Sequence, residues 1–106
     1  MRAEGVNGQV ELNGGMVSIQ RSGLMAKATV GGGEKRIPVK SIQAVQWKPA
    51  SKLTRGFIQF TVPGGVESKG RAKDAASDEN SVLFNGKQQA DFEAIRSAVE
   101  QAIVGA

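Results

Sequence analysis

The segment KQQADFEAIRSAVEQAIV, residues 87–104, decides how the rest of this chain is organised. Apolar residues recur in it at spacings of three, four and four: Phe92, Ile95, Val99 and Ile103. In an α-helix these spacings place all four side chains on one face. Asn85 lies just before the segment as an N-cap, and Gln88 three residues later nearly completes a capping box. The segment therefore predicts an amphipathic helix that closes a core built by the preceding residues.

The residues before this helix predict short β-strands separated by turns. Apolar and polar side chains alternate there with the period of two that a half-buried strand requires. The expected strands are residues 6–12, 16–20, 24–30, 34–39, 42–48, 55–62 and 81–84. Residues 63–80 contain few apolar side chains, and we expect them to form a mobile loop. The chain, residues 1–106, is thus expected to be a single, mostly β domain of about seven strands with one C-terminal helix.

The same alternation selects the side chains that should form the core. One face of each expected strand is apolar, and these faces should pack against the apolar stripe of the helix. The predicted core consists of Val10, Leu12, Val17, Ile19, Ile42, Val45, Ile58, Phe60, Val82, Phe84 and the four apolar residues of the helix.

The residue types that the chain lacks restrict its chemistry. Its 106 residues include no cysteine, histidine or tyrosine. Disulfides, thiolate and imidazole metal ligands, and a histidine general base are therefore excluded. No pair of carboxylates lies on an apolar strand, where burial would raise a carboxyl pKa. We accordingly expect no catalytic residue, no metal site and no cofactor. The first residues lack the apolar core of a signal peptide, so a cytoplasmic location is expected.

Positive charge is concentrated in residues 21–55. That segment contains a single acidic residue, Glu34, against eight basic ones, whereas the whole chain carries a net charge of +4. The candidate residues for binding an anion or a partner are Arg21, Lys27, Lys35, Arg36, Lys40, Lys48, Lys52 and Arg55. Such a field favours an anionic membrane, a nucleic acid or an acidic protein. Lysines that keep exposed strands soluble explain the same pattern. A binding surface requires that the eight side chains converge on one face.

One motif resembles a nucleic-acid signature only in its letters. RGFIQF, residues 55–60, is similar to the strand of RNA-recognition motifs whose aromatic side chains stack on bases. Phe57 and Phe60 are three residues apart, so a strand directs them to opposite faces. Stacking on one face is then excluded, and nucleic acid is disfavoured as a partner.

Two further motifs carry a resemblance to a known family. Gly5-Val6-Asn7-Gly8 leads into a strand that ends Leu12-Asn13-Gly14-Gly15, and residues 37–45 read IPVKSIQAV. Together they resemble a bacterial family of domains of unknown function with a pleckstrin-homology-like fold. The resemblance implies a partly open β-barrel of bent antiparallel sheets, capped at one end by the C-terminal helix. Residues 13–15, the loop of the first hairpin, carry no basic residue, so the phosphoinositide binding of eukaryotic members does not carry over.

These features favour a non-catalytic interaction module. The expected partner is a protein or peptide, bound at a sheet edge or in a groove beside the helix. The alternative is peripheral binding to an anionic membrane through residues 21–55, with nucleic acid less favoured. Self-association into a homo-oligomer stays open at this stage.

Overall fold

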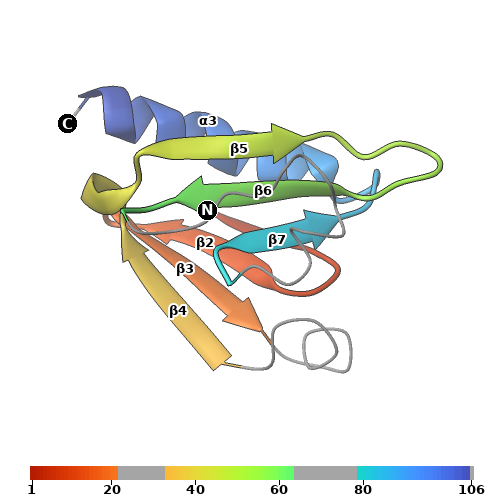
Figure 1. Ribbon diagram of the computed structural model, residues 1–106, viewed down its shortest axis with the longest axis horizontal. Coiled ribbons are helices and arrows are strands. Elements are labelled where there is room, and N and C mark those ends of the chain that lie inside the picture. The colour runs from red at the N-terminus through yellow and green to blue at the C-terminus, as the bar shows by residue number, and fades with distance from the viewer. Residues whose placement is uncertain (22–32, 64–78, 106) are drawn as a thin grey trace.

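The computed structural model describes residues 1–21, 33–63 and 79–105. Within these ranges the chain forms seven strands and one long helix (Figure 1). The elements are β1 (Arg2–Glu4), β2 (Gln9–Asn13), β3 (Met16–Arg21), β4 (Gly33–Pro38), the 3₁₀ helix η1 (Val39–Ser41), β5 (Ala44–Lys48), β6 (Gly56–Thr61), β7 (Ser81–Phe84) and α3 (Gln89–Gly105). Two antiparallel sheets result, with strand orders β1-β2-β3-β4 and β5-β6-β7. The predicted mostly β class with a C-terminal helix is confirmed, and the sheets do not close into a barrel.

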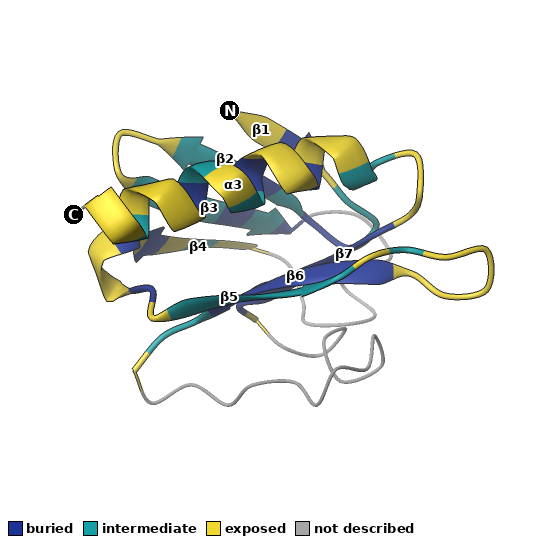
Figure 2. Cartoon of the chain, turned by 90° about the horizontal axis from the view of Figure 1, so that it is seen from above, coloured by how far each residue is buried: buried dark blue, intermediate teal, exposed yellow. Residues whose placement is uncertain are grey.

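The main core lies between the two sheets and α3. It contains the predicted strand residues, of which Leu12 and Val45 are only partly buried at its margin. Ala3, Ile37 and Val39 join it although the alternation did not select them. Figure 2 shows the buried side of α3 turned toward the sheets, with its exposed side facing outward.

α3 is held at its start and along its apolar face as the sequence predicts. The Asn85 side chain accepts hydrogen bonds from the N–H groups of Lys87 (3.0 Å) and Gln88 (3.1 Å). The Gln88 side chain in turn accepts from the Asn85 N–H at 3.0 Å, which completes the capping box. Phe92 is fully buried, and its ring stacks on that of Phe84 with centroids 4.9 Å apart. Aromatic burial of this kind makes α3 the cover of the core.

The N-terminal region differs from the predicted strand at residues 6–12. A separate strand, β1, precedes it, and residues 5–8 form the connection to β2. Val6 leaves the main core and packs with Phe57 and Leu83 on the other side of β6 and β7. A Cβ on Gly5 would lie 2.4 Å from the carbonyl oxygen of Leu83, so this close approach requires glycine. The alternation was misleading because it continued across a connection that crosses from one sheet to the other.

That connection fastens the first sheet to the outer edge of β7. The Val6 N–H donates to the Leu83 carbonyl at 2.8 Å, and the Asn7 side-chain oxygen accepts from the Leu83 N–H at 2.9 Å. The Arg21 guanidinium, at the end of β3, donates to the carbonyl of Ser81 and, at 3.1 Å, to that of Glu79. One backbone hydrogen bond and several side-chain hydrogen bonds therefore join the sheets here, where the described strands form no ladder.

The remaining strand predictions have mixed outcomes. The strand at residues 81–84 is confirmed with its predicted bounds, and those at 16–20, 34–39, 42–48 and 55–62 are confirmed with shifted ends. Val39, the last residue of the strand predicted at 34–39, belongs to η1 instead. β6 is buried on both faces, since Phe60 lies in the main core and Phe57 in the second cluster, which confirms their predicted opposite directions. The predicted strand at 24–30 lies outside the described residues, as does most of the predicted loop 63–80. At the end of that loop, Asn80 is buried and its carbonyl accepts from the Phe60 N–H at 2.9 Å.

Candidate functional site

β5 forms the edge of the second sheet and runs beside α3, as Figures 1 and 2 both show. The register of the sheet determines which backbone groups of β5 form hydrogen bonds with β6. Phe60 donates to Asn80 on the β7 side, so by alternation Gln59 and Thr61 direct their backbone groups toward β5. Their partners on β5 are Gln46 and Ala44. The N–H and C=O groups of Val45 and Trp47 therefore point away from β6, toward an edge on which no described strand pairs.

The other three sheet edges in the described part of the chain are protected. β1 is only three residues long and contacts α3. The outward groups of β7 at Leu83 bond to Val6 and Asn7. β4 carries three consecutive charged residues and ends at Pro38, which has no N–H to offer. Short strands, charges and proline are the usual protection of an edge against pairing. β5, with the sequence AVQWK, has its single charge at its last position.

A small depression lies between the beginning of β5 and the last turns of α3. Its volume is about 230 Å³, and it is lined by Gln43, Ala44, Val45, Glu100, Ile103 and Val104. Val104 is 86% exposed and Ile103 is half-buried, so the depression offers apolar surface at the end of the helix. Small-molecule sites usually measure about 300–1,000 Å³, so this volume suits a single side chain better.

The depression and the surface that continues from it between β5 and α3 form the β5 groove, and a stack of side chains lies at the other end of this groove. Trp47 lies 5.0 Å from the ring of Phe84, and the Arg96 guanidinium lies 5.2 Å above the Trp47 ring. Arg96 Nε is 3.1 Å from a carboxylate oxygen of Glu100. The cation–π contact and the ion pair hold Arg96 across the gap between α3 and β5. The groove is therefore apolar near Val104 and polar near Arg96.

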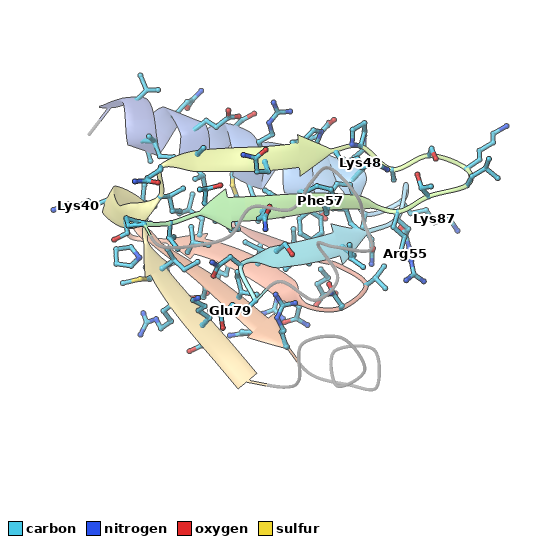
Figure 3. The ribbon with its side chains drawn as sticks, in the orientation of Figure 1. Lys40, Lys48, Arg55, Phe57, Glu79 and Lys87 are labelled. Atoms are coloured by element: carbon cyan, nitrogen blue, oxygen red, sulfur yellow. The ribbon has the colours of Figure 1, made fainter. Side chains whose placement is uncertain are left out.

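The eight basic candidates do not share one face. Arg21 is only 8% exposed, and besides its bonds near β7 it donates to the Asn7 carbonyl at 3.2 Å. Arg21 forms hydrogen bonds inside the fold, so it is not part of a binding surface. Lys27 lies outside the described residues. Lys40 lies at the opposite end of the molecule from Lys48 and Arg55 (Figure 3).

Two further candidates lie on β4. Lys35 Nζ donates to a carboxylate oxygen of Glu79 at 2.7 Å, and Arg36 is exposed. The hydrogen bond from Lys35 and its positive charge hold the pKa of the Glu79 carboxyl below its usual value. Lys35 thus joins β4 to the segment that enters β7, and its charge is partly neutralised there.

The last group of candidates lies together. Lys48 is the last residue of β5, and Lys52 and Arg55 belong to the connection between β5 and β6, whose tip is exposed. The structure therefore divides the basic segment into an interior arginine, a β4 pair, an isolated lysine and one cluster at this tip.

The described residues contain no cluster of His, Cys, Asp or Glu side chains that could hold a metal ion. They also contain no helix with the length and apolar character that a membrane span needs.

Comparison of the sequence with known families identifies the family of the chain. The family model "Domain of unknown function (DUF4429)" matches residues 10–100, which is most of the chain. The chain belongs to the DUF4429 family. No curated protein and no solved structure gives a significant match. The matched residues run from β2 nearly to the end of α3, so the DUF4429 match includes β5 and most of the groove beside it.

Sequence reasoning missed three functional or structural roles. It gave Asn7 no role beyond its motif and took Arg21 for a surface cation, although both bond across the sheets. It also did not identify β5 as the open edge, because strand order is decided by pairing between distant residues. The charged run at β4 and the uncharged run at β5 were the signals in the sequence that could have distinguished the two edges.

Proposed function

We propose that this domain is a non-catalytic interaction module that binds an extended segment of a partner protein along β5. The observation that carries the proposal is the open edge of β5 beside an apolar depression. An added strand would pair with the outward N–H and C=O groups of Val45 and Trp47. One of its apolar side chains would enter the depression beside Ile103 and Val104. Backbone pairing supplies affinity, and the depression supplies selectivity.

The fold supports the same proposal. Two antiparallel sheets of four and three strands, followed by a helix that covers the core, are the arrangement expected of a pleckstrin-homology-like domain. We propose that kinship for the domain as well. Domains of that superfold recurrently bind peptides by adding a strand to a sheet.

The test is to select peptides from a random display library against the intact domain. The affinity of each selected peptide and the hydrogen exchange of the domain's backbone amides are then measured. A selected peptide should slow exchange of the Val45 and Trp47 amides, because these are the groups it covers. Exchange of the Ala44 and Gln46 amides, already paired with β6, should change little. Peptides that bind without protecting Val45 and Trp47 would contradict the proposal.

Two exposed apolar residues provide matched variants. Val104→Asp changes the depression at a side chain that is 86% exposed, so the fold should survive. We expect it to weaken peptide binding by about tenfold, which corresponds to about 1.4 kcal/mol. Leu53→Asp makes the same chemical change at the remote β5–β6 tip and should leave affinity unchanged. Equal losses in both variants would refute the assignment of the site.

The open edge also bears on self-association. Two copies that paired β5 with β5 would protect the same amides without peptide, in a manner that depends on protein concentration. Sedimentation over a concentration series separates that outcome from peptide binding. A stable dimer closed through β5 would overturn the proposal of a peptide partner.

A further inference from the structure

A second surface, distant from the β5 groove, lies at the tip of the β5–β6 hairpin. Leu53 at this tip is 95% exposed, the highest value among the large apolar residues of the described chain. The connection protrudes from the body of the molecule as an exposed arm (Figure 2). Single exposed apolar residues are common and prove nothing by themselves. The rigid turn around Leu53 and the positive charges beside it indicate that this exposed residue has a binding role.

The tip is rigidly built. The Ser51 N–H donates to the Thr54 carbonyl at 2.8 Å, and the Ser51 hydroxyl oxygen accepts from the N–H groups of Thr54 (3.0 Å) and Leu53 (3.3 Å). Lys48 Nζ donates to the Thr54 hydroxyl at 3.0 Å and to the Arg55 carbonyl at 3.3 Å. Several polar groups of the turn thus bond to one another, while the Leu53 side chain is left in solvent.

The base of the hairpin is equally constrained. A Cβ on Gly56 would lie 2.4 Å from the Lys48 carbonyl oxygen and 2.6 Å from the Ala50 nitrogen, so the two strands approach too closely for any other residue. The Ala50 N–H donates to the Gln89 side chain at 2.8 Å, which attaches the hairpin to the start of α3. The arm therefore presents Leu53 in a fixed position and would lose little conformational entropy on docking.

Positive charge surrounds this apolar apex. Lys48, Lys52 and Arg55 belong to the hairpin, and residues 43–63 contain no acidic residue. Figure 3 shows Lys48, Arg55 and Lys87 at the same end of the molecule. Lys87 lines a separate depression with Arg2, Glu4 and Asp91, where two cations and two carboxylates balance. The three cations of the hairpin therefore supply the attraction.

We propose that the β5–β6 tip docks on an anionic phospholipid bilayer, with Leu53 entering the interface and Lys52 and Arg55 meeting the headgroups. A convex apex with an apolar side chain in front and cations behind matches a membrane, whose apolar interior lies beneath a negative surface. A bound peptide needs a concave or edge-like surface, which the tip lacks. Nucleic acid would bring phosphates against Leu53 and would find no aromatic side chain for stacking. Because one leucine and three cations form a small anchor, the binding should be weak and reversible.

The test is sedimentation of the intact domain with vesicles of phosphatidylcholine containing about 30% phosphatidylserine, and with phosphatidylcholine vesicles alone. The domain should bind the anionic vesicles at low salt and bind them less at physiological salt. It should not bind the neutral vesicles. The double variant Lys52→Ser and Arg55→Ser should lose about fivefold for each cation removed. Absence of binding to anionic vesicles at low salt would overturn the proposal.

Leu53→Ser separates insertion from simple charge attraction. It keeps every cation, and we expect about a tenfold loss of partitioning into anionic vesicles, from the removal of a buried isobutyl group. Val104→Ser and Lys40→Ser are the matched controls, an exposed apolar residue and an exposed cation away from the tip, and both should bind as wild type does. Docking through the tip would be refuted if Leu53→Ser left vesicle binding unchanged. It would also be refuted if Lys40→Ser reduced binding as much as the single variant Lys52→Ser does. Single-stranded DNA should compete weakly, and tight binding to it would favour nucleic acid instead. Thermal melting of each variant verifies that it is folded.

Discussion

Replacing Arg21 by alanine should destabilise the domain severely, because this arginine joins the two sheets. Its side chain is 8% exposed, and its guanidinium donates to the carbonyls of Asn7, Glu79 and Ser81. Asn7 and Ser81 are themselves buried. A hydrogen bond from a charged donor contributes about 1.5–3 kcal/mol, so the loss of two buried ones amounts to about 3–6 kcal/mol. A domain of this size has about 5–15 kcal/mol in total.

Urea unfolding followed by the fluorescence of Trp47, the single tryptophan, measures this loss directly. The thermal midpoint should fall by at least about 12 °C, since each kcal/mol lowers it by about 4 °C or more. Arg36→Ala is the matched control, because Arg36 is exposed on the neighbouring strand and should change stability by less than about 0.5 kcal/mol. Arg21→Lys keeps the charge but lacks the planar fork that reaches several carbonyls, so it should lie between the two. Similar midpoints for Arg21→Ala and Arg36→Ala would refute the role of Arg21 between the sheets.

Two further predictions concern α3 and the β4 ion pair. Phe92→Ala removes a fully buried ring stacked on Phe84 and should lower the free energy of unfolding by about 3–5 kcal/mol; a thermal midpoint within a few degrees of wild type would show that α3 does not cover the core. Because Lys35 lowers the pKa of Glu79, their pairing stabilises the folded state above the ordinary carboxyl pKa and is lost as the pH falls through the lowered value. At pH 7, Lys35→Met should therefore lower the free energy of unfolding by less than about 1 kcal/mol, because the pair is so exposed. Near pH 2 the variant and the wild type should have the same thermal midpoint. A difference that persisted in acid would exclude the ion pair as its cause.

The elements whose signals are local follow from the order of the residues alone. The apolar spacing from Phe92 to Ile103 and the Asn85 cap specify α3, because residues within one turn of a helix interact with each other before any tertiary contact forms. Strict alternation in residues 16–20 likewise specified β3, with its inward face correct. The apolar residues of 81–84 predicted β7, which is buried on both faces. The mostly β class with a terminal helix followed from these patterns alone.

The position of β5 at an edge and the distribution of the basic residues follow instead from contacts between distant segments. Val6 continued an alternating pattern, yet it crosses to the second sheet because Gly5 permits a close approach to Leu83. Arg21 has the same side chain as Arg36, but the pairing of strands far apart in sequence buried one and exposed the other. Among the described strands, the same pairing left β5 with no outer neighbour, and it put Leu53 at a protruding tip. Edges, burial and surface clusters depend on contacts between distant segments, which local periodicity does not encode.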